Sequence, residues 1–384
     1  MKVIFMGTLP PIIGLSPYCL HLSNALSKKI DLEFLGFKEF SKKSKSFYRE
    51  FKIDETLYID ILKHIKIKKI LSWYNPFSAI KAGLKIKADI LHVQWWLSSL
   101  IFIYLPVMIL AKLKNIKIVL TVHNILPHEQ NRKNLILDKF VSRLIFLFAD
   151  VFIVHNKRNK KKFIETYRLH KKNIHIITHG VLNLIKQRAI SSQNARKYLH
   201  LQLNKKIVLF FGYIRKYKGL DVLINAFSLI HNQIKDAFLL IVGQPYKESW
   251  DNYEKLLKVN NLEKCSKVEL GFIPESEIEY YFSAADIVAL PYIYLDTHGG
   301  VGALALAFKK PLVVTDVGGL PEYVKDKKVI AYPKNPEDLA LKIIRVLNNK
   351  QFKKKLSNDS KKLSIELNWD EIADKTIKIY NSLL

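Results

Sequence analysis

The sequence has only two cysteines, Cys19 and Cys265, and few acidic residues beside its many basic ones. Two cysteines so far apart in the chain support neither a disulfide framework nor a zinc site, so a reducing, cytoplasmic environment is expected. No group of carboxylates or histidines has the spacing of metal ligands. We therefore expect no metal ion and no other cofactor.

Long apolar runs are also missing. The longest, residues 97–111, contains Pro106 and is shorter than the roughly 20 residues that a transmembrane helix requires. The N-terminal apolar segment turns at Gly7 and Pro10 before the core of a signal peptide could form. Neither a membrane span nor a secretory signal is expected.

The charge is strongly one-sided, with 62 Lys and Arg against 34 Asp and Glu and a net charge of +28. Such an excess attracts nucleic acid, anionic lipid or phosphorylated substrates, unless it is a lysine-rich bias spread over solvated surface. No recognition motif for nucleic acid is found, and we expect no nucleic-acid partner. Apolar residues at 61–74 recur with an imperfect helical period among several lysines, which favours an amphipathic helix, and a second basic cluster spans 157–162. Both suit docking on an anionic membrane, at its cytoplasmic face.

Short β-branched runs alternate with amphipathic stretches along the chain, which is the pattern of parallel sheets covered by helices. Two such series predict two doubly wound, Rossmann-like α/β domains at residues 1–185 and 206–368. A polar linker at 186–205 joins them, and a last helix at 369–384 follows. Strands are predicted at 2–6, 31–37, 90–93, 116–122 and 151–154, and then at 207–211, 238–242, 268–270, 287–290 and 312–314.

Ligands of open α/β sheets bind at the carboxyl ends of the strands, so the loops after strands are the candidate sites. In one such loop Gly212 allows a tight turn, and Arg215 and Lys218 precede the next helix. Two cations beside a helix N-terminus suit a diphosphate, although an ordinary basic turn would have the same residues. The loop is not a Walker P-loop.

Two further loops of the second domain are rich in glycine. One has three glycines at positions 299, 300 and 302, with Asp296 as its only carboxylate, and the other turns at residues 318 and 319. Glycine leaves backbone N–H groups open to an anion or to sugar hydroxyls. Three such loops at one edge of one sheet indicate a ligand that carries phosphate.

These motifs resemble the donor-binding half of retaining glycosyltransferases of family four, which have the GT-B fold. The resemblance rests on Gly212, Arg215 and Lys218, on the helix start at 299–301, and on Gly-Gly-Leu-Pro-Glu at 318–322. The first half agrees, with Gly-Thr-Leu-Pro at 7–10 and Thr-Val-His-Asn-Ile-Leu-Pro-His-Glu at 121–129. The resemblance extends over nearly the whole chain.

The resemblance implies two Rossmann-like domains that face a cleft. It further implies transfer of a hexose from a nucleoside-diphosphate sugar to a saccharide or lipid-linked acceptor, with retention of configuration. The pathway would be synthesis of cell-surface polysaccharide or glycolipid. No metal is needed in such a reaction, because the cations of the donor loop supply the positive charge. The last helix would cross back to the first domain.

The family also implies roles for single residues. Arg215 and Lys218 match the residues that neutralise the leaving diphosphate, and His123 matches a histidine beside the transferred sugar. Of two glutamates that the family usually has eight positions apart, Asp296 replaces the one near the sugar and Leu304 the one on the ribose. The other expected donor-site residues are Gly212, Ile273, Gly299, Gly300 and Val301, and the expected acceptor-site residues are Gly14, Ser16 and His128.

Several alternatives stay open. Leu304 cannot bind a ribose hydroxyl, which is compatible with a degenerate, non-catalytic scaffold of the same fold. A sugar-nucleotide epimerase with this fold is another alternative, although the spacing of Arg215 and Lys218 favours transfer. Trp95 and Trp96 either stack on a sugar or, more simply, pack in the core. The remaining histidines at strand ends, His155, His175 and His179, have structural hydrogen bonds as their simplest role.

Overall fold

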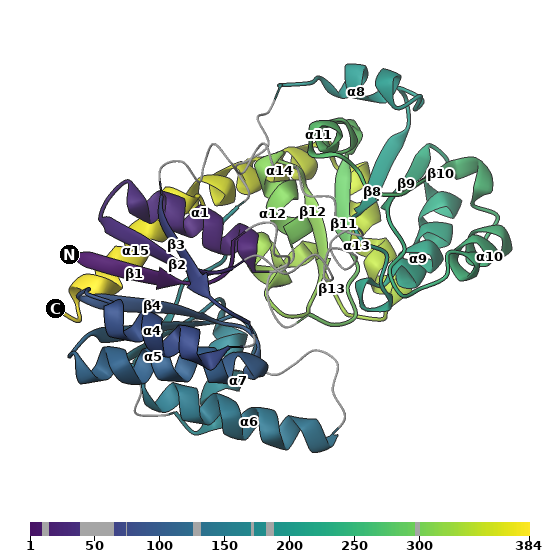
Figure 1. Ribbon diagram of the computed structural model, residues 1–384. Helices are drawn as coiled ribbons and strands as arrows, with labels where there is room; N and C mark the ends of the chain where they lie inside the picture. The colour runs from purple at the N-terminus through teal and green to yellow at the C-terminus, as the bar shows by residue number, and fades with distance from the viewer. Residues whose placement is uncertain are drawn as a thin grey trace. The chain divides into compact units, whose positions relative to one another are not determined.

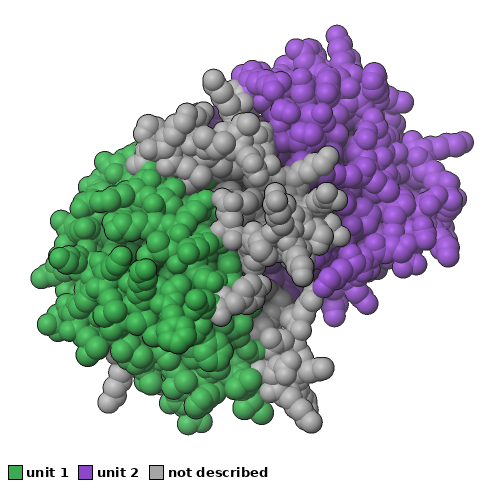
Figure 2. Space-filling view, viewed as in Figure 1, with its two compact units in different colours: residues 1–180, 369–384 green, residues 181–368 purple. Residues whose placement is uncertain are grey.

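The computed structural model describes residues 1–9, 15–38, 65–73, 75–125, 132–169, 173–181, 188–295 and 300–384. The chain forms two compact units (Figure 2). Unit 1 consists of residues 1–180 and 369–384, and unit 2 of residues 181–368. Each unit is built on its own parallel sheet, which confirms the predicted pair of Rossmann-like α/β domains.

Unit 1 has a seven-stranded sheet in the order β3-β2-β1-β4-β5-β6-β7. Its strands are β1 (Lys2–Met6), β2 (Asp31–Phe37), β3 (Lys66–Leu71), β4 (Ile90–Trp95), β5 (Lys117–Val122), β6 (Val151–Val154) and β7 (Asn173–Ile176). One face of the sheet is covered by α1 (Ser16–Ser27) and α15 (Trp369–Asn381) (Figure 1). The other is covered by α4 (Pro76–Lys85), α5 (Ile101–Leu113), α6 (Arg132–Leu147) and α7 (Lys157–Tyr167), with the short helix η2 (Ser98–Leu100) before α5.

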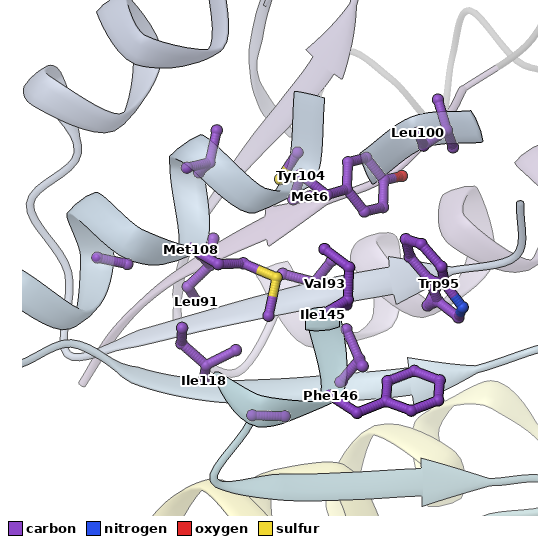
Figure 3. Close-up of a cluster of buried hydrophobic side chains, with 14 of the residues drawn as sticks. Met6, Leu91, Val93, Trp95, Leu100, Tyr104, Met108, Ile118, Ile145 and Phe146 are labelled. Carbon is purple, nitrogen blue, oxygen red and sulfur yellow. The ribbon is translucent and has the colours of Figure 1, made fainter. Parts of the chain in front are cut away.

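The main core of unit 1 lies between the sheet and α5 and α6. Val93 of β4, Tyr104 and Met108 of α5 and Phe146 of α6 point toward one another there (Figure 3). Burying such side chains contributes about 1.5–3 kcal/mol each to stability. Trp95 belongs to the same cluster and is 2% exposed, so it packs in the core rather than presenting a stacking surface.

The C-terminal helix α15 is part of unit 1. His92 of β4 is hydrogen-bonded through Nδ1 to the Tyr380 hydroxyl at 2.5 Å and through Nε2 to Thr121 at 2.7 Å. Trp369 packs so closely on Gly180 that a Cβ there would be 2.6 Å from the indole ring. The chain thus returns to unit 1 beside the point where it left it.

Unit 2 has a six-stranded sheet in the order β10-β9-β8-β11-β12-β13. The strands are β8 (Lys206–Phe211), β9 (Ala237–Gly243), β10 (Ser266–Leu270), β11 (Ile287–Leu290), β12 (Leu312–Thr315) and β13 (Ile330–Ala331). The helices are α8 (Ser192–Tyr198), α9 (Leu220–Gln233), α10 (Asp251–Val259), α11 (Glu275–Ala284), α12 (Gly300–Ala307), α13 (Pro336–Asn348) and α14 (Lys350–Glu366). Short 3₁₀ helices are η3 (Lys216–Lys218), η4 (Glu263–Cys265), η5 (Leu320–Tyr323) and η6 (Lys327–Val329). Two apolar cores fill the two sides of the sheet.

Two expectations of the sequence need correction. The described part of residues 61–74 contains the edge strand β3 rather than an amphipathic helix, because its backbone pairs in parallel with β2. Lys66 and Lys68 also lie 3.8 and 2.7 Å from the carboxylate of Glu33 on β2. The described part of the segment predicted as a linker is folded onto unit 2. Its helix α8 packs on α11, and the buried Arg196 donates to Asp286 at 2.8 Å. Within the described ranges, no helix is both long and apolar enough to cross a membrane.

Candidate functional site

The loop between β8 and α9 is held open by two glycines with left-handed backbone. Gly212 has φ +98°, and Gly219 has φ +66°, where a Cβ would lie 2.1 Å from the carbonyl oxygen of Pro291. Only glycine adopts these conformations without strain. Backbone hydrogen bonds of 2.8 and 3.0 Å from Ile214 to Gln244 and from Tyr246 to Ile214 attach this loop to the one after β9. The basic loop is therefore a rigid part of the sheet edge.

Lys218 and Arg215 are set against aromatic rings in this loop. The Arg215 guanidinium lies 4.1 Å from the ring centroid of Tyr246, and the Lys218 ammonium lies 5.6 Å from that of Tyr292. Lys218 is buried, and burial together with the positive charge of Arg215 lowers its pKa to about 7. An anion that binds beside a buried cation and a second cation is stabilised by both, because it offsets the cost of burial and the repulsion between them.

The first residue of the cationic loop lies next to the start of another predicted donor motif. A Cβ on Gly212 would meet Nζ of Lys218 at 3.1 Å and Cγ2 of Val301 at 3.2 Å. The structure thus brings together Gly212, Lys218 and Val301, which the sequence assigned to one donor site. Gly300 begins α12, with no atom within 4 Å of a Cβ built on it.

The other predicted donor residues lie in different settings. Ile273 follows β10 and packs half-buried against one core of unit 2. Leu304 is a core residue of α12, so it offers no polar group to a ribose. Asp296 and Gly299 lie outside the described residues. The sequence missed Tyr246, because its place beneath Arg215 depends on the pairing of two loops that follow different strands.

A row of polar side chains crosses the carboxyl edge of the sheet in unit 1. His123 follows β5, and its Nε2 lies 2.9 Å from Oε1 of Gln94 on β4. Its Nδ1 lies 2.9 Å from Nε2 of His155, which follows β6. Nδ1 of His155 lies 3.0 Å from the carbonyl oxygen of Ile177. Four adjacent strands are linked in this way at the position where the sequence predicted a sugar-binding histidine.

The number of N–H groups that the hydrogen bonds of this row require shows whether His123 and His155 are charged. With the Gln94 oxygen facing His123, three hydrogen bonds need three N–H groups on two rings, and the pair is positively charged. With the amide turned over, Gln94 donates to His123, His123 donates from Nδ1 to His155, and His155 donates to Ile177, so both rings are neutral. Burial, helped by His155, lowers the pKa of His123 well below its ordinary value. The neutral arrangement is therefore favoured.

Both nitrogens of His123 are thus engaged within unit 1. Nδ1 of His123 is held by His155, which is almost completely buried. A sugar hydroxyl can therefore bond only to Nε2, and only if Gln94 releases it. The ring of Tyr18 packs edge-on against His123 at 4.7 Å and holds it from the side. Ser16, predicted as an acceptor residue, is buried and donates its hydroxyl proton to Thr8 at 3.1 Å. Gly14 and His128 lie outside the described residues.

The hydrogen bond between His123 and His155 predicts a stability effect. We expect His155→Phe to lower the free energy of unfolding by about 1–3 kcal/mol, because the Nδ1–H of His123 loses its acceptor in a buried place. Chemical denaturation measures this change. The control is His175→Phe, at a half-buried histidine on β7 whose Nε2 has no hydrogen-bond partner among the described residues. An equal effect of both substitutions would contradict the assignment, as would NMR signals of a His123 ring without a proton on Nδ1.

Within the described parts of the chain, no three His, Cys, Asp or Glu side chains converge as metal ligands would. Arg215 and Lys218 provide positive charge at the sheet edge of unit 2. Two parallel-sheet units, one with a cationic loop and glycine turns at its sheet edge, define a GT-B protein.

Comparison with known sequences agrees with this class. Residues 13–181 match the family described as Glycosyltransferase Family 4, and residues 191–363 match Glycosyl transferases group 1. The two matches together cover most of the chain, which belongs to this glycosyltransferase family. The resemblance inferred from the motifs is confirmed.

Individual relatives are more distant. An uncharacterized glycosyltransferase of Methanocaldococcus jannaschii, MJ1607, is 33% identical over 190 residues, which are 49% of this chain and 47% of that protein. A D-inositol 3-phosphate glycosyltransferase of Corynebacterium aurimucosum is 27% identical over 254 residues, 63% of this chain and 59% of the relative. The chain thus spans about half to three fifths of the length of these two relatives.

Solved structures share the fold over the whole chain. Anabaena Alr3699/HepE in complex with UDP has a TM-score of 0.76 at 17% identity, and the match covers 100% of both chains. Sucrose-phosphate synthase from Thermosynechococcus elongatus has a TM-score of 0.70 at 18% identity, with 100% of this chain and 99% of that one covered. At these identities the likeness establishes the GT-B fold.

Proposed function

We propose that the protein transfers a hexose from a nucleoside-diphosphate sugar to a saccharide or lipid-linked acceptor, with retention of configuration. The observation that carries this proposal is the buried Lys218 beside Arg215 at the edge of unit 2. Their charge is positioned for a diphosphate before any ligand arrives. Two similarities support a nucleotide-sugar donor. One is to a relative named as a D-inositol 3-phosphate glycosyltransferase, and the other is to Alr3699/HepE, whose solved structure contains UDP. We further propose that the protein acts in the cytoplasm, in cell-surface polysaccharide or glycolipid synthesis.

In the proposed reaction the acceptor hydroxyl attacks the anomeric carbon on the face from which the diphosphate departs. The new carbon–oxygen bond forms as the bond to the phosphate oxygen breaks, and the acceptor proton passes to the departing phosphate. Negative charge develops on that phosphate, and cations already in place stabilise it without reorganisation. Lys218 and Arg215 have this role in our proposal, Asp296 orients the sugar, and no metal takes part.

Nucleotide titration tests the donor site directly. We would follow the thermal midpoint with UDP, GDP, ADP and their sugar conjugates, for the wild type and for Lys218→Ala. A ligand at 100 times its Kd stabilises the folded protein by about 2.7 kcal/mol. One nucleotide that shifts the wild type but not the variant would support the proposal and identify the base. No shift with any nucleotide would instead favour a non-catalytic scaffold, for which the buried Leu304 is the supporting observation.

The pKa of Lys218 also predicts how nucleotide affinity varies with pH. Below about pH 7 the lysine is already charged, and the affinity is expected to be constant. Above it the free protein has a neutral lysine, so binding of a diphosphate must take up a proton. The Kd of the nucleoside diphosphate is therefore expected to rise by up to about tenfold per pH unit between pH 7 and 9.

Calorimetry in buffers of different ionisation enthalpy measures the affinity and the proton uptake together. The phosphate itself titrates at about pH 6, below this range. Lys218→Arg is the matched variant, because arginine keeps its charge at all these pH values. Its affinity should not change with pH. A wild-type Kd that stays constant from pH 7 to 9 would rule out Lys218 as the titrating contact.

A further inference from the structure

Large apolar side chains lie exposed on the outer sides of three neighbouring helices in unit 1. They are Phe77 and Leu84 on α4, Phe102 and Leu113 on α5, and Ile136, Leu137, Phe140 and Leu147 on α6, and all are 60–75% exposed. Single exposed apolar residues are common, but several of them on the outer sides of neighbouring helices indicate an interaction surface.

Helix geometry places these side chains on one surface. Phe77 and Leu84 are seven positions apart, Phe102 and Leu113 eleven, and Ile136 and Phe140 four, which puts the two members of each pair on one side of their helix. These six side chains are the ones considered below. Helix α5 packs against both α4 and α6, and all three cover the same face of the sheet (Figure 1). Their inner sides are buried in the core between helices and sheet. We call the outer surface formed by the six side chains the α4–α6 face.

The charge on these helices is as uneven as their apolar surface. The three helices contain seven Lys and Arg but only one acidic residue, Asp138. Asp138 is half-buried and accepts a hydrogen bond from the Ser98 hydroxyl, so it offsets little of this positive charge at the surface. Lys81, Lys85 and Arg143 are exposed among the apolar side chains. The surface therefore suits a partner that is apolar and anionic at once.

We propose that the α4–α6 face docks on the surface of an anionic lipid bilayer. Such a bilayer presents acyl chains to the phenylalanine and leucine side chains and phosphate head groups to the lysines and arginine. Long basic side chains can cover apolar surface while their charged ends reach the head groups. This inference rests on the proposed function only in that it selects a lipid-linked acceptor over a free saccharide.

Flotation with lipid vesicles tests the proposal on the full chain. The vesicles contain phosphatidylcholine alone or with phosphatidylglycerol. We expect binding to the anionic vesicles, weakened several-fold by salt at roughly three to four times the physiological concentration, because charge attraction is screened. The triple variant F77S/F102S/F140S is expected to bind at least about tenfold more weakly. The matched control V259S/Y332S/L341S replaces three residues of unit 2 with similar exposure and should bind like the wild type.

Other outcomes would overturn the proposal. Equal binding by both triple variants would place the lipid contact elsewhere. No vesicle binding, with a wild-type dimer in sedimentation that F77S/F102S/F140S converts to a monomer, would make the face a self-association surface. If that variant melts early, K81E/K85E/R143E tests the same face through its charge, and undiminished binding would count against it. No nucleotide is present in these experiments, so their failure is distinct from failure of the donor titration.

Discussion

Lys218→Ala is expected to lower kcat with a nucleotide-sugar donor by about 10²–10³-fold, which is the usual cost of removing one preorganised group that stabilises developing charge. Lys218 is buried, and its ammonium group and the Val301 side chain both lie close to the Cα of Gly212. The measurement is the initial rate of nucleoside diphosphate release, with the donor that the titration identifies. Lys216→Ala, at an exposed lysine of the same 3₁₀ helix η3, is the matched control and should keep the wild-type rate.

Stability separates this loss of rate from a loss of fold. The pKa of Lys218 falls from 10.5 in the unfolded chain to about 7 in the folded protein, so the charged form destabilises the fold. That destabilisation is complete below about pH 7 and diminishes as the pH rises toward 10.5. Lys218→Ala should therefore melt at or above the wild-type temperature near pH 7. A variant that is active, or inactive only because it melts early, would contradict the proposed role.

Gly219→Ala is expected to destabilise unit 2 by at least about 2 kcal/mol, because both its backbone and its surroundings exclude a side chain. Its φ is +66°, and the added Cβ would lie 2.1 Å from the carbonyl oxygen of Pro291. That atom is backbone and cannot rotate away, so the loop must shift. The thermal midpoint should fall by several degrees, at about 2–4 °C per kcal/mol for a unit of this size.

Two other glycines of unit 2 serve as controls for this substitution. Gly271 has φ +139° but no atom within 4 Å of its Cβ position, so Gly271→Ala measures backbone strain alone. Gly300 has open space and no left-handed backbone, and Gly300→Ala should leave the midpoint unchanged. If Gly219→Ala melted no earlier than Gly271→Ala, the contact of the added Cβ with Pro291 would not contribute to the loss of stability.

The sequence predicted the fold well where strands are continuous apolar runs. All ten predicted strands are present, and the bounds of four, 2–6, 31–37, 151–154 and 287–290, agree to the residue. It missed β3, because an edge strand with lysines toward solvent mimics an amphipathic helix. It also missed β7 and β13, which are four and two residues long and carry little periodic signal. Helix α7 was missed because its first turns are mostly basic.

The sequence predicted which residues of a single loop belong to the site, but not which residues of other loops lie beside them. Reading the loops after strands was enough to group Gly212, Lys218 and Val301, because their strands end at one sheet edge. The partners of His123 could not be predicted in the same way. Gln94 and His155 become its neighbours only through the order β4-β5-β6, which alternation of helices and strands does not determine. Which residues are neighbours across adjacent strands at a sheet edge could be learned only from the structure.

The way the chain leaves and re-enters unit 1 has a consequence for evolution and engineering. Gly180 and Trp369 are in contact, and the backbone N–H of Val181 donates to the carbonyl oxygen of Leu367 at 2.8 Å. The two ends of unit 2 are thus adjacent, as in a domain inserted into a loop of another. If the donor binds unit 2 and the acceptor unit 1, as we propose, a related unit 2 spliced at these two junctions is expected to change the sugar nucleotide while unit 1 keeps its acceptor.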